Sequence, residues 1–261
     1  MGGIYFKGDF MLFKRMRKKN IISPIPLYLK GVTVSTNDDA RAIFSSSPHS
    51  FAVLAEEQTG GKGRNGKSFV SKKNNGVYLS LCFPAGEISI NKELITPAVA
   101  VAAVKAISRF GFYVQIKWVN DIFYGGKKIS GILCEAITDP ITLSVTGFIC
   151  GIGVNTGKKG LNGELKEIAG FIPVKADKLA GELIKEITNE LCHGENADIA
   201  ARYRALQLIF GKEITFSHNG NILSGKAVNT DENGALTVLS DGKEITVKSG
   251  EITLESKNFT K

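Results

Sequence analysis

The chain has 261 residues, with 33 Lys and Arg against 25 Asp and Glu, which gives a formal net charge of +8. A hydrophobic share of 43% excludes an intrinsically disordered chain, and the length fits one large domain or a large domain with a small one. Six of the cations and one acid lie in residues 1–20, so most of the net charge belongs to a basic N-terminal extension (1–28) and does not by itself indicate nucleic-acid binding.

Residues 29–210 mix segments of helical periodicity with β-rich runs. Gly111 is placed to end a long helix, and Gly125-Gly126 predicts a two-residue hairpin turn. Successive hairpins predict an α+β fold, with a mixed, largely antiparallel sheet and the helices on one face. The predicted helices are 36–44, 91–110, 176–192 and 197–210, and the predicted strands are 51–55, 76–83, 113–118, 122–124, 128–135 and 141–153.

Residues 211–261 follow a different pattern of short β-runs separated by Asn-Gly and Asp-Gly pairs, which favour tight hairpins. Such a segment predicts a small SH3-like β-barrel. A unit of about 50 residues buries little apolar surface, so we expect it to pack on the larger domain. Its predicted strands are 212–217, 222–230, 235–239, 243–248 and 252–254.

No segment has the pattern of an export signal or a membrane span. The longest apolar run of the N-terminal extension is 10–13, and the most apolar helix candidate stops at Lys105, short of the ~20 residues that a span needs. The four cysteines lack CxxC spacing, and three of them lie in apolar runs, as reduced core thiols do. The sequence therefore predicts a cytoplasmic protein with no membrane partner.

The segment 58–69 (QTGGKGRNGKSF) matches both the GxxxxGK[ST] and the GxGxxG patterns. Each pattern requires a helix to begin where the loop ends, but here turn-forming residues and a β-run follow. A helix beginning at Lys67 would favour a P-loop NTPase. What remains is a glycine-rich loop without an acid, suited to cover a phosphate-bearing ligand, with an ordinary solvated loop as the alternative. Its cations are Lys62, Arg64, Lys67, Lys72 and Lys73.

Two further segments suit a charged ligand. In 117–121 (KWVND) a compact cation stands beside an amide and a carboxylate, which suits a nucleoside triphosphate; the alternative is that Trp118 packs in the core and a turn follows. If Lys128 points inward from the hairpin, it would meet a ligand carboxylate, whereas a solvated lysine is the alternative. The small residues of 151–155 (GIGVN) allow a flat ring to approach the backbone.

Other catalytic patterns are missing from the sequence. The three histidines have no metal-binding spacing, and neither HExxH nor GxSxG occurs. A reaction here would depend on positioning and on phosphate electrostatics, without a protein nucleophile.

Taken together, the segments 35–37 (STN), 58–66, 117–121, 128–133 (KISGIL) and 151–155 resemble the biotin protein ligases, or biotin–[acetyl-CoA-carboxylase] ligases. The resemblance covers about residues 30–255 and marks 29–210 as the catalytic domain. It implies ATP-dependent biotinylation of a lysine on the biotin carboxyl carrier protein of acetyl-CoA carboxylase, or of a related biotin enzyme, through biotinyl-5′-AMP and with Mg²⁺. Lipoate–protein ligase, which uses the same adenylation logic, is the nearest alternative.

The resemblance also implies roles for individual residues. Lys117, Arg64 and Lys128 would carry catalysis, and Asp121 is a candidate for Mg²⁺ although no metal ligand is firmly assigned. Biotin would be bound by Ser35, Thr36, Asn37, Gln58, Lys62, Gly63, Arg64, Lys128 and Gly131. The nucleotide would be bound by Gly61, Phe69, Lys117, Trp118, Asn120, Asp121 and Asn155. Lys62, Phe69 and Val119 depart from the family pattern, where Arg, Trp and Pro are common.

Some members of the family carry an N-terminal helix-turn-helix domain and act as repressors. About 30 residues precede Ser35, too few for that domain, so we expect a ligase without a DNA partner. The oligomeric state stays open, with a homodimer as one option.

Overall fold

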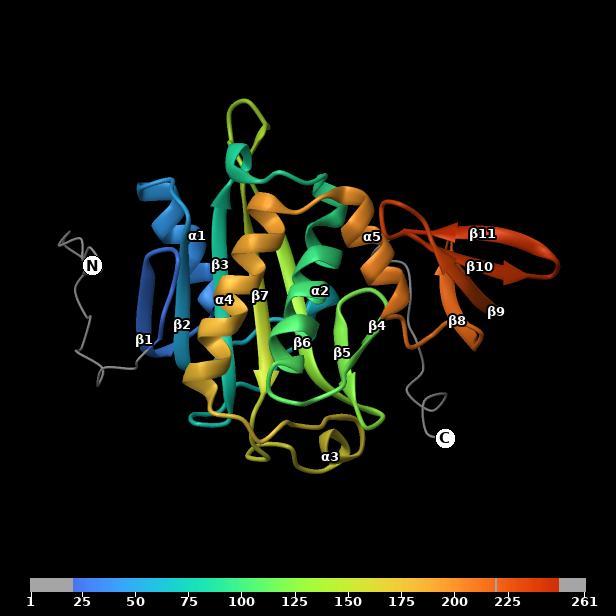
Figure 1. Cartoon of the computed structure of the whole chain (residues 1–261), viewed down its shortest axis with the longest axis horizontal. Helices are drawn as coiled ribbons and strands as arrows, with labels where there is room; N and C mark the ends of the chain where they lie inside the picture. Colours follow the sequence, from blue (N-terminus) through green and yellow to red (C-terminus); the bar gives the residue numbers. More distant parts are fainter. Residues whose placement is uncertain (1–20, 219, 249–261) are drawn as a thin grey trace.

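The computed structural model describes residues 21–218 and 220–248, which form a seven-stranded sheet and a smaller four-stranded sheet (Figure 1). The large sheet has the order β1-β2-β3-β7-β6-β5-β4. Only β1 and β2 pair in parallel, so the predicted mixed, largely antiparallel sheet is confirmed. The strands are β1 (Leu27–Thr33), β2 (Phe51–Gln58), β3 (Gly76–Pro84), β4 (Gln115–Lys117), β5 (Asp121–Tyr124), β6 (Lys127–Thr138) and β7 (Val145–Asn155).

Helices cover both faces of this sheet. In Figure 1, α2 (Ile95–Ser108) and α4 (Ala176–His193) lie in front of it, as the prediction of helices on one face requires. That prediction is wrong for α1 (Thr36–Ser46), which packs Ala40 and Phe44 against Phe51 on the opposite face. The reason is that β2 and β3 are apolar on both faces, and each apolar face must be covered.

Two helix boundaries differ from the prediction. The segment predicted as helix 91–110 begins with a 3₁₀ turn, Lys92–Leu94, before α2. The segment predicted as helix 197–210 ends early, because α5 (Asn196–Ala205) gives way to residues that pair with the edge strand β4. There the Ile116 amide donates to Leu206 O at 2.9 Å, and the Leu208 amide donates to Ile116 O at 2.8 Å. The strand β1 and the short helix α3 (Glu164–Ile168) were not predicted.

The small sheet has the order β11-β10-β9-β8 and is antiparallel throughout. Positive φ angles at Gly220, Gly234 and Gly242 confirm the predicted hairpin turns. Within the described residues it is an open four-stranded sheet and no closed barrel, and the fifth predicted strand, 252–254, lies outside them. Its strands are β8 (Glu213–His218), β9 (Asn221–Thr230), β10 (Leu236–Ser240) and β11 (Lys243–Val247).

The small sheet packs on the larger domain, as expected. Its residues Phe216 and Val238 belong to the same core as α2 and α4. Two hydrogen bonds reinforce the contact: Trp118 Nε1 donates to Gly234 O and Arg204 Nε donates to Thr230 O, each at 2.9 Å. None of the helices in the described part of the chain is long and apolar enough to cross a membrane.

Candidate functional site

Residues 60–68, which we call the glycine loop, form a compact hairpin of their own. The Gly63 amide donates to Lys67 O at 2.7 Å, the Phe69 amide donates to Gly61 O at 2.8 Å, and Arg64–Gly66 make a short 3₁₀ turn. Lys67 has extended backbone angles, φ −67° and ψ 147°, so no helix begins there. The P-loop NTPase alternative therefore lacks the helix that it requires.

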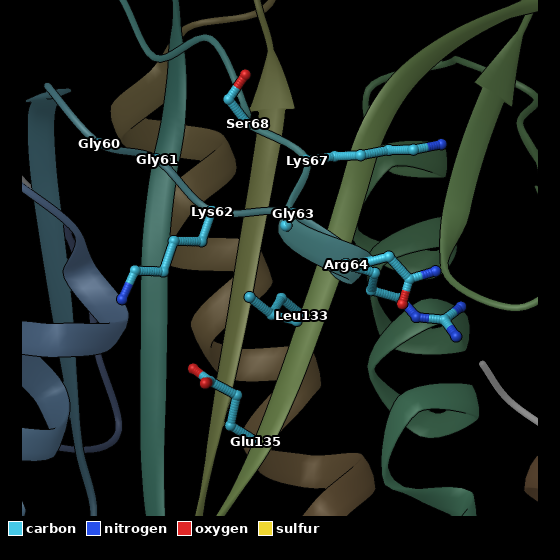
Figure 2. Close-up of a pocket in the computed structure, with 11 residues that line it drawn as sticks. Gly60, Gly61, Lys62, Gly63, Arg64, Lys67, Ser68, Leu133 and Glu135 are labelled. Atoms are coloured by element: carbon cyan, nitrogen blue, oxygen red, sulfur yellow. The ribbon is translucent and has the colours of Figure 1, made fainter.

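The glycine loop crosses the strands of the large sheet and, with Leu133 and Glu135 of β6, lines an open cavity of about 690 Å³ (Figure 2). It is attached on two sides. Lys62 Nζ lies 2.6 Å from Asp38 Oδ1 in α1, and Arg64 Nη1 donates to Asn120 Oδ1 at 3.3 Å. Figure 2 shows these two side chains pointing in different directions from the loop. The loop thus extends from α1 to the turn between β4 and β5.

Beside α1 lies a cluster of hydrogen-bonding side chains, which we call the polar end, and Arg41 Nη2 lies 3.4 Å from Glu135 Oε1 in it. The amide and the Oγ1 of Thr36 donate to Gln58 Oε1 at 2.9 and 3.1 Å. Ser80 Oγ lies 2.7 Å from Thr36 Oγ1 and 2.5 Å from Asn37 Oδ1. Asn37 Nδ2 donates to Glu135 Oε2 at 2.7 Å. The structure thus brings together three predicted residues, and Ser35 is buried beside them at the start of α1.

Sequence reasoning missed two members of this cluster, Ser80 and Glu135. Ser80 is fully buried in β3 and is the only polar residue of the apolar run 77–83 apart from a tyrosine, which is the signal that could have identified it. Glu135 directly follows an apolar run and carries no comparable signal.

At the other side of the loop, Arg64, Lys117, Asn120, Asp121 and Lys128 form what we call the cationic end. Lys128 Nζ lies 2.7 Å from Asp121 Oδ1 and 3.4 Å from where a Cβ on Gly131 would stand. An irregularity in the pairing of β5 with β6 puts Lys128 on the same face as Gly131, although the two are three residues apart. Lys127 instead donates from Nζ to Lys166 O at 2.8 Å. Lys128, and not its neighbour, is therefore the inward lysine.

Positive charge is in excess at the cationic end. Burial lowers the pKa of Lys117 to about 8, an effect that Asp121 opposes and that Lys128 and Lys67 reinforce. Burial also lowers the pKa of Arg64, against the attraction of Asp121. One carboxylate faces three or more cations, so an anionic ligand would be electrostatically favoured here.

Three glycines on β6 and β7 connect the two ends. Gly131 pairs with Gly153, and Gly151 lies two residues along β7 on the same face. A Cβ on Gly151 would stand 2.3 Å from Asn37 Oδ1, and one on Gly153 would stand 2.4 Å from Phe69 Cε1. Only glycine allows these side chains to lie directly on the sheet. The glycines form a flat floor from the polar end to the cationic end.

Two predicted nucleotide-binding residues have other contacts. Trp118 is 5% exposed and its indole is hydrogen-bonded to Gly234 of the small sheet, which matches the core-packing alternative. Asn155 is buried, and its Nδ2 donates to Gly170 O at 3.0 Å, so it fixes the segment after α3 at the end of β7.

A resident Mg²⁺ does not fit the side chains of this site. Within the described part of the chain no three His, Cys, Asp or Glu residues gather as metal ligands. Asp121 is already paired with Lys128, and the side chains around it are cations.

Comparisons with known proteins find a matching family and similar ligases. Residues 31–155 match the Biotin/lipoate A/B protein ligase family. The chain is 30% identical to the bifunctional ligase/repressor BirA of Bacillus subtilis over 210 residues, 74% of this chain and 62% of that protein. It is 24% identical to a biotin–[acetyl-CoA-carboxylase] ligase of Mycobacterium tuberculosis over 240 residues, 84% of this chain and 85% of that protein. The chain thus spans less than two thirds of the Bacillus relative.

Solved structures show the same fold. The biotin protein ligase from Aquifex aeolicus, in complex with biotin and ATP, superimposes with a TM-score of 0.75 at 22% identity, over 88% of this chain and 98% of that one. At this identity the likeness concerns the fold.

Proposed function

Because residues 31–155 match the Biotin/lipoate A/B protein ligase family, we propose that this chain is an ATP-dependent biotin–[acetyl-CoA-carboxylase] ligase. In the first step a biotin carboxylate oxygen attacks the α-phosphorus of ATP, the bond to the bridging oxygen breaks, and biotinyl-5′-AMP and pyrophosphate form. In the second step a lysine amine of a biotin carboxyl carrier protein attacks the acyl carbon, an amide forms, and AMP leaves.

The observation that carries this proposal is the position of the glycine loop. It covers a floor of glycines and is attached at one side to Asp38 of α1, beside the polar end, and at the other to Asn120 of the cationic end. A molecule with a neutral hydrogen-bonding head and a carboxylate tail fits this arrangement, with its head at the polar end and its carboxylate at the cationic end. A nucleotide phosphate fits next to that carboxylate.

The polar end suits the ureido ring of biotin, which offers two N–H donors and one carbonyl acceptor. Thr36, Asn37 and Gln58 supply hydroxyl and amide groups of both kinds within one hydrogen-bonded cluster. Because these groups already satisfy one another, the ring must replace existing hydrogen bonds. This makes the polar end selective for a matching set of donors and acceptors.

The cationic end suits the reacting groups. Lys128 would hold the biotin carboxylate at the α-phosphate, exchanging its Asp121 partner for the ligand. Lys117 and Arg64 would neutralise charge that develops on the phosphate oxygens, and their lowered pKa values reflect burial that strengthens such interactions. The closed glycine loop would keep water from the mixed anhydride. No protein nucleophile is required, and ATP would bring its Mg²⁺ as part of the substrate.

Biotin-dependent ATP–pyrophosphate exchange tests the first step, with lipoate as the comparison because the family includes ligases for both acids. We expect exchange with biotin and none with lipoate; the opposite result would make the chain a lipoate–protein ligase. Transfer is tested with labelled biotin, MgATP and an apo carrier domain on a denaturing gel. A carrier band that needs ATP and the target lysine is expected, and an unlabelled carrier would contradict the second step.

The cytoplasmic location and the lack of a DNA partner stay predictions that belong to this proposal. If the basic extension alone causes any retention on DNA, removal of residues 1–20 should abolish that retention and leave ligation intact. Persistent retention would show a second DNA-binding surface.

A further inference from the structure

The glycine loop is attached to α1 through Asp38, which lies outside both the polar end and the cationic end. Asp38 lies in the first turn of α1, and its Oδ1 accepts from Lys62 Nζ at 2.6 Å. The two side chains are 46% and 50% exposed, so the ion pair lies at the rim of the site and not beneath the loop. The ammonium group of Lys62 is therefore held by a protein carboxylate, although Lys62 also lines the cavity beside the loop.

The helical turn that carries Asp38 is anchored to the large sheet. The neighbouring Asp39 anchors this turn of the helix to β1, because its carboxylate accepts from Thr33 Oγ1 at 2.6 Å and from Lys30 Nζ at 3.3 Å. The preceding residue, Asn37, donates a hydrogen bond to Glu135 of β6. The carboxylate of Asp38 thus has a defined position relative to the sheet.

The ion pair between Lys62 and Asp38 can restrain the whole glycine loop, because the loop is one hydrogen-bonded unit. The backbone hydrogen bond from Gly63 to Lys67 and the bridge between Lys62 and Ser68 make it one hairpin. A contact that fixes Lys62 therefore also restricts the Arg64 side of the loop, which reaches Asn120.

We propose that Asp38 is a positioning residue that holds the glycine loop closed through Lys62 and so prolongs the retention of biotinyl-5′-AMP between the two steps. This inference rests on the proposed function. An ion pair that is half exposed contributes modestly and is screened by salt. The expected effect is on the rate of release of the intermediate and not on its chemistry.

The chain offers a matched control. Asp38→Asn and Asp39→Asn remove the same charge from the same helical turn, but only the first removes a contact with the loop. After loading with labelled biotin and MgATP and rapid gel filtration, the Asp38→Asn variant should release the adenylate about three- to fivefold faster than the parent, as a weak surface ion pair allows. The Asp39→Asn variant keeps a side-chain oxygen that can accept from Thr33 Oγ1, so the turn should stay anchored and the adenylate should be released at close to the parental rate.

Two further results should accompany this one. Lys62→Gln should match Asp38→Asn, and the double variant should be no faster than either single one, because all three lack the same ion pair. At about 0.5 M NaCl the difference between parent and Asp38→Asn should shrink, since salt screens exposed charges. Equal release from parent and Asp38→Asn, or equal acceleration in Asp38→Asn and Asp39→Asn, would overturn the proposal.

A second measurement does not depend on the ligase activity. Amide hydrogen exchange of residues 61–68 in the ligand-free chain should be faster in Asp38→Asn than in Asp39→Asn, and equal exchange would contradict the attachment. If the parent makes no adenylate while the exchange difference is present, the proposed function fails and the role of Asp38 in loop closure stands.

Discussion

The two ends of the site differ in whether the protein itself supplies partners for their polar and charged side chains. At the polar end, Thr36 donates to Gln58, and the buried Ser80 hydroxyl is hydrogen-bonded to both Thr36 and Asn37. At the cationic end, Lys117 and Arg64 have pKa values lowered by burial, and Asp121 is paired with Lys128. The polar end is arranged before a ligand arrives, whereas the cationic end keeps an excess charge that only an anion compensates. Binding at the polar end should therefore depend on shape and hydrogen bonding, and binding at the cationic end on protonation.

The largest effect is expected from Lys128→Ala. Loss of the ammonium group would leave the biotin carboxylate without its cationic partner, so kcat/KM for biotin in adenylate formation should fall on the order of 100-fold. Lys127→Ala is the matched control, because Lys127 points away to Lys166 O and its loss should change kcat/KM less than about twofold. Near-normal biotin activation by Lys128→Ala would show that its role is wrongly assigned.

The next effect concerns pH and Lys117. Its amine is charged below a pKa of about 8 and neutral above it, so kcat/KM for ATP should fall as the pH rises through this value. Lys117→Met should give kcat/KM on the order of 10- to 30-fold lower at pH 7, with no further fall toward pH 9.5. A variant that keeps the parental pH profile would exclude Lys117 as its source.

The same lowered pKa has a consequence for stability. Since the folded pKa of about 8 lies below the ordinary value of 10.5, the unfolded chain binds more protons between these values. This residue therefore makes the free energy of unfolding rise from about pH 8 to pH 10.5. Denaturant titrations across that range should show a smaller rise for Lys117→Met.

An intermediate effect is expected at the polar end. Ser80→Ala removes the hydroxyl between Thr36 and Asn37, so the KM for biotin should rise about five- to tenfold, in keeping with the loss of one or two neutral hydrogen bonds. The KM for ATP should stay within about twofold, and neither value should gain a new pH dependence. An equal rise in both KM values would mean that the polar end and the cationic end do not bind biotin and ATP independently.

The smallest effect on activity should come from Trp118→Phe, because the structure ties this indole to the small sheet and to neither end. Loss of the hydrogen bond from Nε1 leaves the Gly234 carbonyl unsatisfied and should lower the free energy of unfolding by about 1–2 kcal/mol. Both KM values should stay within about threefold. A selective rise in the KM for ATP would return Trp118 to the nucleotide site.

Features that depend on neighbouring residues could be predicted from the sequence. The Gly-Gly, Asn-Gly and Asp-Gly turns determine hairpins through local backbone geometry, and the glycines of 151–155 predicted a close approach to the sheet. The resemblance to a known family, carried by the order of the motifs, then implied which residues surround the loop.

Features that depend on distant pairing could not be predicted. Strand alternation alone left open which of Lys127 and Lys128 points inward, because this depends on an irregularity between β5 and β6, and only the family resemblance indicated Lys128. The contacts of Asp38 with Lys62 and of Asn37 with Glu135 join residues 24 and 98 positions apart, and α1 covers the second face only because β2 is apolar on both sides. The core position of Trp118 likewise depends on the small sheet.

The central claim is that biotin and the nucleotide lie in line beneath the glycine loop, and a crystal structure with a non-hydrolysable biotinyl-adenylate analogue tests it most directly. The account predicts the ureido ring beside Thr36 and Gln58, the acyl end at Lys128, and residues 61–67 closed over both. An analogue bound elsewhere, or a loop turned away from it, would contradict the account.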